Sequence, residues 1–227
     1  MLAIMPFACA AILFLVLRLW ADDDVKYATE YLFMYTLMGA AWLGVFLKIA
    51  TFCGIDPIVD TLEHRNPAVL IPSAALMVAL TVAFAGGNMG NGPGWWVVIF
   101  SSGIACGSLL LCWLVLECLR DDSPSEKITV DRDITAGVRF AGLLLSCGLI
   151  FGRAAAGDWV SADATFIDFI CLAWPGFLLT GVFLVQELVL PRPPSDNGAE
   201  VVTTGILPAG AYLAAALGWL YYVGPWQ

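Results

Sequence analysis

Residues 65–76, RNPAVLIPSAAL, and residues 132–143, RDITAGVRFAGL, open two similar segments of the chain. The similarity continues to the end of both segments, where residues 114–117, LVLE, match residues 184–187, LVQE. Each segment holds two long apolar runs separated by a short polar connection, which is the pattern of a helical hairpin. The sequence therefore predicts two copies of one hairpin.

The composition indicates a membrane protein. The chain has 227 residues, of which 60% are hydrophobic and only 13% are charged, whereas soluble domains carry about 25% charged residues. The net charge of −9 comes mostly from acidic residues in short connections such as residues 22–24 and 56–63. Nucleic acid is not a predicted partner, because the chain lacks the cluster of Lys and Arg that binds phosphates.

Seven apolar segments are long enough to cross a hydrocarbon core of about 30 Å, which takes about 20 helical residues. The predicted spans are residues 2–20, 28–53, 67–86, 95–119, 134–153, 164–190 and 204–223. The predicted fold class is therefore all-α, a polytopic bundle of seven transmembrane helices. Its predicted parts are an N-terminal two-helix region at 1–64, the hairpin copies at 65–119 and 132–190, and a single C-terminal span at 204–223.

Two signals predict the orientation of the bundle. The connections on the N-terminal side hold most basic residues, which favour the cytoplasm: Arg65, Arg120, Lys127, Arg132 and Arg192. Trp and Tyr, which prefer the headgroup level, gather at the opposite side: Trp20, Tyr27, Tyr31, Trp95, Trp96, Trp159, Tyr221, Tyr222 and Trp226. With an odd number of spans, the N-terminus is predicted in the cytoplasm and the C-terminus on the other side.

Four ionisable residues inside the spans form a predicted charged layer in the cytoplasmic half. At a rise of about 1.5 Å per residue, Lys48 and Arg139 lie about 8 Å from the ends of their helices, and Glu117 and Glu187 about 3 to 5 Å from theirs. Because charge inside a membrane is costly, this layer is the candidate site. It fits ion pairs that orient the bundle, an ion or proton pathway lined by Glu117 and Glu187, or contact with a partner subunit.

A second charged pair is predicted near the outer membrane surface. Asp168 lies roughly 6 Å from the outer end of its helix, too far in depth from Arg139 to pair with it. Arg153 is its predicted partner.

Three further motifs predict packing and turns. Gly103 and Gly107 have the spacing that allows helices to approach closely, which favours packing within the bundle and leaves a dimer face as the alternative. The seven cysteines contain no Cys-x-x-Cys and are predicted to be small packing residues. The glycine-rich run 86–94 lacks the Lys-Ser/Thr of a phosphate-binding loop and is predicted to be a flexible outer turn.

No motif in the chain indicates catalysis. His64 is the only histidine, and no Ser/His/Asp or Cys/His set is present. We therefore expect no catalytic residue, no metal site and no cofactor, and the protein is not expected to be an enzyme. Action on lipid would need a partner that supplies catalytic groups.

The two hairpin openings, together with residues 141–153 and the Gly157-Asp158 pair, resemble the YjfL-like bacterial inner-membrane family, a tandem domain of unknown function. The resemblance covers about residues 30 to 190. Family members open each copy with Asn and a small residue, whereas the second copy here has Asp133 and Ile134. The resemblance implies a multi-pass protein of a bacterial inner membrane and assigns no catalytic residue.

Together these features predict a non-catalytic membrane subunit or scaffold. Its predicted partners are the lipid bilayer and other membrane subunits or the protein itself, since few hydrophilic residues lie outside the bilayer. The alternative is a small transporter or channel that uses the charged layer. A polar cavity that reaches Glu117 and Glu187 would favour the alternative.

Overall fold

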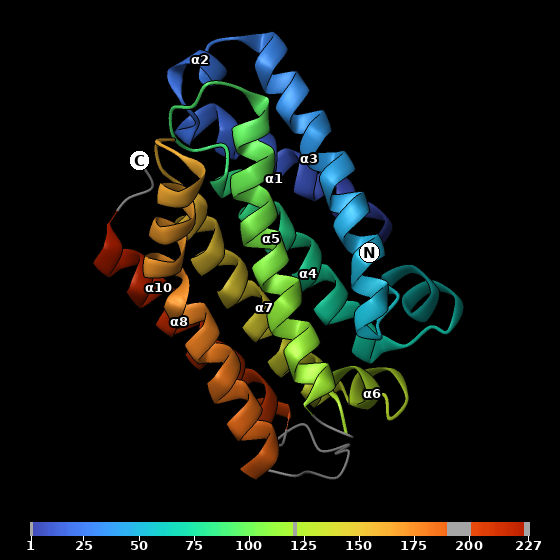
Figure 1. The fold of residues 1–227 in the computed structure, drawn as a ribbon. Coiled ribbons are helices and arrows are strands. Elements are labelled where there is room, and N and C mark those ends of the chain that lie inside the picture. The colour runs from blue at the N-terminus through green and yellow to red at the C-terminus, as the bar shows by residue number, and fades with distance from the viewer. Residues whose placement is uncertain (1, 120–121, 190–200, 225–227) are drawn as a thin grey trace.

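The computed structural model describes residues 2–119, 122–189 and 201–224, and this part of the chain is helical without strands (Figure 1). The long helices are α1 (Met5–Trp20), α3 (Thr29–Ala50), α4 (Pro67–Gly86), α5 (Trp95–Cys118), α7 (Ile134–Ala155), α8 (Ala162–Val189) and α10 (Leu207–Val223). The short ones are η1 (Leu2–Ile4), α2 (Asp23–Lys26), η2 (Thr51–Cys53), η3 (Val59–Glu63), α6 (Pro124–Thr129) and η4 (Val201–Ile206). Within the described residues, seven helical segments are long and apolar enough to cross a membrane. The predicted all-α bundle of seven spans is confirmed.

The long helices form two layers that follow the order of the chain. α1, α4, α7 and α10 lie in a row, each packed against the next. In the second layer, α3 packs on α1 and α4, α5 on α4 and α7, and α8 on α7 and α10. Each hairpin supplies one helix to each layer, and its second helix covers the seam between two first helices. α4 and α7 make the most extensive contact and occupy the centre of the bundle (Figure 1).

α4 and α7 approach closely because small residues line their contact. A side chain at Gly148 would begin 2.6 Å from the Cα atom of Ala79, and one at Gly86 would begin 2.0 Å from the carbonyl oxygen of Gly152. Lipid tails are as apolar as leucine, so helices in a membrane associate mainly through packing of this kind. Small residues therefore fix the spacing of the central helix pair.

The two chain segments that enter α4 and α7 share one local geometry. Arg65 and Arg132 both adopt the left-handed backbone conformation, with φ of 49° and 56°. The residues that follow, Asn66 and Asp133, cap their helices with side-chain oxygens that accept hydrogen bonds from first-turn amides. Non-glycine residues rarely adopt this backbone conformation, which costs about 1–3 kcal/mol. Its recurrence at matching positions is a structural counterpart of the sequence repeat.

The same two segments also bind each other. Asn66 Nδ2 donates to the carbonyl oxygens of Ile128 at 2.9 Å and Thr129 at 3.1 Å. Arg132 Nη2 donates in return to the carbonyl oxygen of His64 at 3.3 Å. These bonds hold the starts of α4 and α7 at the same level.

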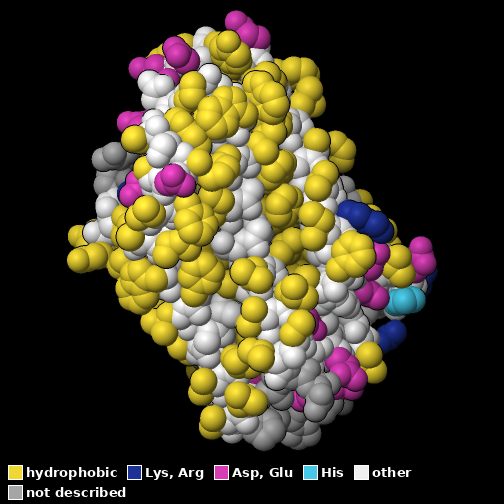
Figure 2. Space-filling view, viewed as in Figure 1, with side chains coloured by type: hydrophobic (Ala, Val, Ile, Leu, Met, Phe, Trp, Pro, Cys, Tyr) yellow, Lys and Arg dark blue, Asp and Glu magenta, His cyan; other side chains and the backbone are white. Residues whose placement is uncertain are grey.

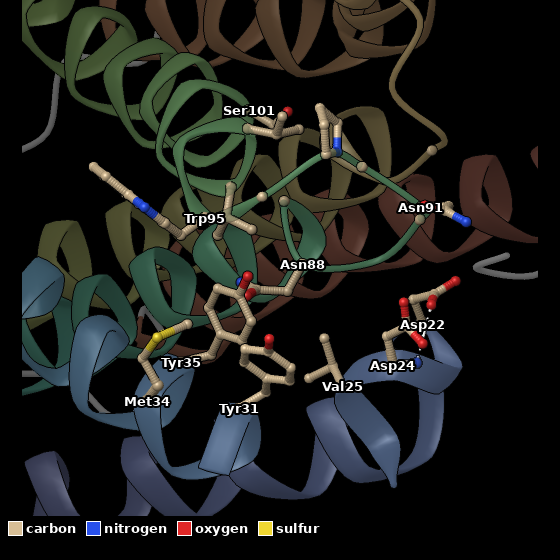
Figure 3. Close-up of a pocket in the computed structure, with 18 residues that line it drawn as sticks. Asp22, Asp24, Val25, Tyr31, Met34, Tyr35, Asn88, Asn91, Trp95 and Ser101 are labelled. Carbon is tan, nitrogen blue, oxygen red and sulfur yellow. Dashed lines mark hydrogen bonds between the residues drawn. The ribbon is translucent and has the colours of Figure 1, made fainter. Parts of the chain in front are cut away.

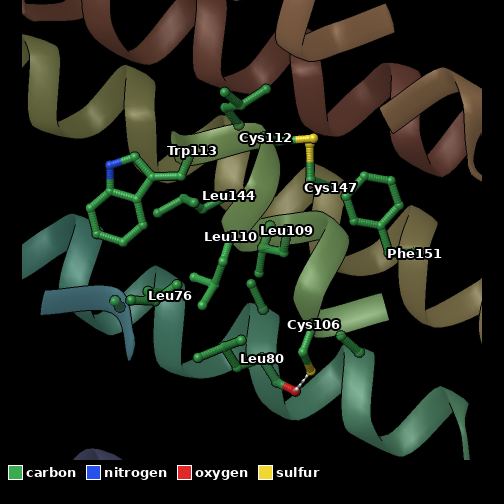
Figure 4. Packing of buried hydrophobic residues seen from close by; sticks show 14 of the residues in the cluster. Leu76, Leu80, Cys106, Leu109, Leu110, Cys112, Trp113, Leu144, Cys147 and Phe151 are labelled. Carbon is green, nitrogen blue, oxygen red and sulfur yellow. Dashed lines mark hydrogen bonds between the residues drawn. The ribbon is translucent and has the colours of Figure 1, made fainter. Parts of the chain in front are cut away.

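The seam between α4, α5 and α7 is filled by leucine, aromatic and cysteine side chains (Figure 4). Trp113 of α5 and Phe151 of α7 are fully buried there. Cys106 is also buried, and its thiol donates to the carbonyl oxygen of Leu80 at 3.7 Å. All seven cysteines are free, and five of them are buried, in agreement with their predicted packing role.

The outward faces of the long helices are largely apolar. Figure 2 shows hydrophobic side chains over the middle of one face of the molecule, with acidic groups mostly toward its two ends. Large hydrophobic side chains that are exposed on the outward faces of the helices include Phe33 of α3 and Leu178 of α8. Helices surrounded by lipid are expected to carry such a surface.

The two ends of the bundle carry different connections. α2 lies at the top of Figure 1, α6 lies at the bottom, and α10 ends at the left side of the view. Neither α2 nor α6 was predicted from the sequence, because both lie in polar connections. Of the residues used to predict orientation, Arg120, Arg192 and Trp226 lie outside the described residues.

Candidate functional site

Glu187 and Arg139 of the predicted charged layer form a buried ion pair between α8 and α7. Arg139 Nη2 lies 2.6 Å from Glu187 Oε1, and Arg139 Nε donates to the same oxygen at 2.8 Å. The two side chains are only 3% and 5% exposed. Arg139 Nη1 also donates to the carbonyl oxygen of Thr204 at 2.9 Å. The pair therefore ties η4 as well as α8 to the central helix α7.

Lys127 is the second cation of this cluster, and its role was missed from the sequence. Its Nζ atom lies 3.1 Å from Glu187 Oε2 and 3.0 Å from Asp122 Oδ2. A usable signal is present in residues 123–126, SPSE, which have the pattern of a helix start with Ser at the cap and Pro in the first turn. In the structure Ser123 caps α6, and α6 packs against α7. This fold-back brings a connecting-loop lysine to Glu187.

Among the described residues, the partners of Glu117 are neutral groups and not cations. Its Oε1 atom accepts hydrogen bonds from Trp113 Nε1 at 2.8 Å and from the backbone amide of Ser125 at 3.1 Å. The Ser125 hydroxyl lies 2.7 Å from the same oxygen and 2.8 Å from the carbonyl oxygen of Cys53, so its single proton serves one of them at a time. Glu117 thus joins α5 to α6 and η2.

When the two predicted copies are aligned, the residues around Glu117 differ from those around Glu187. With the offset that aligns Arg65 to Arg132, the residue of α4 that matches Arg139 is Pro72. The residue that matches Lys127 is Asp60, whose carboxylate bonds the amide of Asp56 and the ring of His64. The first copy therefore lacks both cations that neutralise Glu187 in the second copy.

Lys48 lies outside the charged cluster. It is exposed on α3, and no ion pair among the described residues includes it. The structure therefore brings two of the four predicted layer residues together, places Glu117 in a separate network, and leaves Lys48 at the surface.

The predicted outer pair is not formed. Arg153 is 9% exposed, and its Nε atom donates to the carbonyl oxygen of Gly224 beyond α10, at 3.4 Å. Asp168 is exposed on α8. The Arg153 side chain is directed toward the end of α10, whereas the Asp168 side chain lies at the surface of α8.

Gly103 and Gly107 do not mark a close helix contact within the described residues. A side chain added at Gly103 would meet the ring of Trp42 at an ordinary 3.8 Å, and one at Gly107 would meet nothing within 4 Å. The close contact lies instead between α4 and α7. Gly103 therefore lies at ordinary contact distance from Trp42 of α3, whereas Gly107 has no such neighbour within the described residues.

The described residues hold no group of three His, Cys, Asp or Glu side chains that could bind a metal ion. In the buried cluster, the Glu187 carboxylate lies between the cations Arg139 and Lys127, and Lys127 also pairs with Asp122. Breaking such a buried arrangement is costly because it leaves an unpaired charge. The chemistry of the cluster is therefore suited to holding helices together.

Comparison with known proteins gives a family without an assigned activity. No curated protein and no solved structure matches the chain. A family described as Domain of Unknown Function matches residues 3–155, from the first span to the end of α7. The match thus includes the first span, which lies outside the predicted YjfL-like resemblance over about residues 30 to 190. It ends before α8. Over two thirds of its length, this chain belongs to the DUF350 family.

Proposed function

We propose that the protein is a non-catalytic membrane subunit that packs against a second copy of itself through the edge formed by α8 and α10. The supporting observation is the open end of the first layer. α1, α4 and α7 each pack against the second helix of their own hairpin. α10 packs against α7 and α8, and much of the rest of its surface is exposed.

The open edge carries a small-residue face. Gly210, Ala214 and Gly218 recur every four residues along α10 and are exposed. Side chains added at Gly210 or Gly218 would meet nothing within 4 Å. Small residues at this spacing allow two membrane helices to approach closely, and the same face on a second copy is complementary to it.

A groove runs beside this face. It encloses about 460 Å³ and is lined by apolar residues, among them Trp174 and Leu178 of α8 and Gly218 and Tyr222 of α10. A two-fold arrangement would place α10 of each copy against this edge of the other, and two-fold pairs are the commonest symmetric assemblies. We therefore favour a second copy as the occupant.

The charged cluster supports a structural role over the alternative of a small transporter or channel. A carrier needs a carboxylate that exchanges its proton or ion. Glu187 is held by two cations, and Glu117 accepts hydrogen bonds from Trp113 and Ser125. We further propose that the protein is related to the YjfL-like family and lies in a bacterial inner membrane. Its N-terminus then lies in the cytoplasm and its C-terminus in the periplasm.

Replacement of Glu187 by Gln tests the alternative directly. We expect proton flux into liposomes containing the variant to equal that of the wild type, because the carboxylate serves packing. The flux is measured with a pH-sensitive dye under an imposed potential. Loss of a wild-type flux with intact assembly would favour the transporter and contradict the subunit proposal.

Gly218→Leu tests the proposed packing edge. A leucine side chain there would separate the two α10 helices, and we expect dimerisation in liposomes to weaken about tenfold, or about 1.4 kcal/mol. Gly44→Leu is the matched control, since Gly44 on α3 is also exposed with nothing within 4 Å. Stepwise photobleaching of labelled protein over a range of protein-to-lipid ratios measures the equilibrium. A wild type that stays monomeric, or equal weakening by both variants, would overturn the proposal.

A further inference from the structure

A cavity of about 380 Å³ (Figure 3) lies beside α2, at the end of the bundle opposite α6 (Figure 1). Three parts of the chain that are distant in sequence form its walls: the start of α2, the first turns of α3, and the glycine-rich connection that leads into α5. The residues used below are Asp22, Asp24, Tyr31, Tyr35, Asn88 and Trp95. The predicted outer turn at residues 86–94 thus forms one wall of a cavity large enough for a small organic molecule.

The ionisable groups at this cavity are acidic. Asp22 and Asp24 line it, and no Lys, Arg or His is among its described lining residues. The nearby Lys26 pairs with Asp23 at 3.6 Å. The nearby Arg18 donates to the carbonyl oxygen of Lys26 and lies over the ring of Tyr27. The carboxylates at the cavity therefore have no ion-pair partner among the described residues, and they attract a cation.

Asn88 provides an independent indication of a ligand. It is 4% exposed, and its Nδ2 atom donates to the carbonyl oxygen of Phe84 at 2.8 Å. Its Oδ1 atom is buried and has no hydrogen-bond partner within the described part of the chain. In Figure 3 its side chain extends toward Tyr35 at the wall of the cavity. A buried acceptor without a partner costs about 1–3 kcal/mol, and an N–H donor in the cavity would remove that cost.

Aromatic rings complete the walls. Tyr31 and Tyr35 of α3 face the cavity together (Figure 3), and Trp95 of α5, which is 57% exposed, lies at its rim. The faces of such rings attract ammonium groups, with Trp the strongest, and they also bury the carbon skeleton of an organic ligand.

We propose that this cavity binds a small organic ammonium ion that carries N–H donors. The Asp22 and Asp24 carboxylates neutralise its charge, the rings hold its carbon skeleton, and Asn88 Oδ1 accepts one of its hydrogen bonds. The ammonium group comes either from a free amine or from the headgroup of an ethanolamine lipid. Both sources present the same chemistry to the site.

The experiment uses the whole protein in nanodiscs of phosphatidylcholine, with diaminobutane as the probe and calorimetry as the readout. We expect saturable binding of diaminobutane and none of butanediol, which has the same carbon chain without the charge. Tetramethylammonium, which lacks N–H donors, is expected to bind at least tenfold more weakly. Binding of butanediol as strong as that of diaminobutane would refute the proposal, as would the absence of saturable binding of diaminobutane.

Two variants localise the binding. Asp22→Asn combined with Asp24→Asn keeps the side-chain oxygen by which Asp22 caps α2 and removes both charges, and we expect at least a tenfold loss of affinity. Asp23→Asn is the matched control, because Asp23 lies between them in the chain and is not among the lining residues. Equal losses in the two proteins would mean nonspecific attraction and would overturn the site.

Nanodiscs that contain phosphatidylethanolamine distinguish the two sources. Weaker apparent binding of diaminobutane there identifies the lipid headgroup as an occupant, whereas unchanged binding identifies a free amine. Trp95→Leu, which removes a ring and leaves both carboxylates, is expected to weaken binding of diaminobutane about threefold or more, in line with about 0.5–1 kcal/mol for an exposed cation–π contact. Unchanged affinity in this variant would contradict the role of the rings.

Discussion

Replacing Glu187 with Leu is expected to lower the free energy of unfolding by about 3–5 kcal/mol, the usual range when one member of a buried ion pair is removed. The variant leaves Arg139, which is 3% exposed, without its counter-ion. Lys127 retains Asp122 at 3.0 Å, so most of the loss comes from Arg139. Unfolding in detergent, followed by circular dichroism, measures the effect.

A second substitution tests the cause of that loss. Arg139→Met in the Glu187→Leu background removes the unpaired cation and keeps an apolar side chain of similar length. We expect the double variant to recover most of the lost stability, because replacing a buried ion pair with apolar residues is often neutral. A double variant less stable than the single one would show that Arg139 stabilises the fold through its bond to Thr204 and not through Glu187.

The second large effect is expected at the centre of the bundle, in Gly148→Ala. The added carbon would lie 2.6 Å from the Cα and Cβ atoms of Ala79 and 2.9 Å from its carbonyl oxygen. Backbone atoms cannot rotate away, so α4 and α7 must move apart. We expect a loss of about 1–3 kcal/mol, as for other overpacked cores. The free energy of unfolding in detergent is again the measured quantity.

Gly107→Ala provides the matched control for that substitution. Gly107 also lies in the middle of a long helix, but an added carbon there meets nothing within 4 Å. The free energy of unfolding of the Gly107→Ala variant should equal that of the wild type or exceed it by up to about 1 kcal/mol, because alanine has the higher helix propensity. Ala79→Gly added to Gly148→Ala should restore part of the loss, since it removes one of the clashing atoms. Similar losses from Gly107→Ala and Gly148→Ala would contradict the packing that the structure assigns.

The charged layer was predicted only in part, for a definite reason. The position of a residue along its helix follows from counting residues. That count placed Glu187 and Arg139 at the same level, and the two side chains do meet. The direction in which each side chain leaves its helix depends on neighbouring helices. Lys48 therefore lies at the surface, and the partners of Glu117 within the described residues are Ser125 and Trp113.

The contacts of the glycines also depend on how the helices are rotated, which the sequence pattern does not show. The spacing of Gly103 and Gly107 is a valid signal for close packing, but it does not identify the helix that approaches. The structure places Gly86 and Gly148 in the tight contact instead, although they lie on different helices and have no common sequence motif. Similarly, the sequence could not predict that Asn88 Oδ1 is buried without a hydrogen-bond partner, because that depends on how α3 and the glycine-rich connection pack together.

The sequence by itself determined where the chain forms its seven long helices, because apolar length and helix-start residues act locally along the chain. Only the tertiary structure decided which charges meet, which glycines are in contact and where the cavities lie. Those outcomes depend on how each helix is rotated about its axis, and that rotation is set by the packing of side chains from distant parts of the chain.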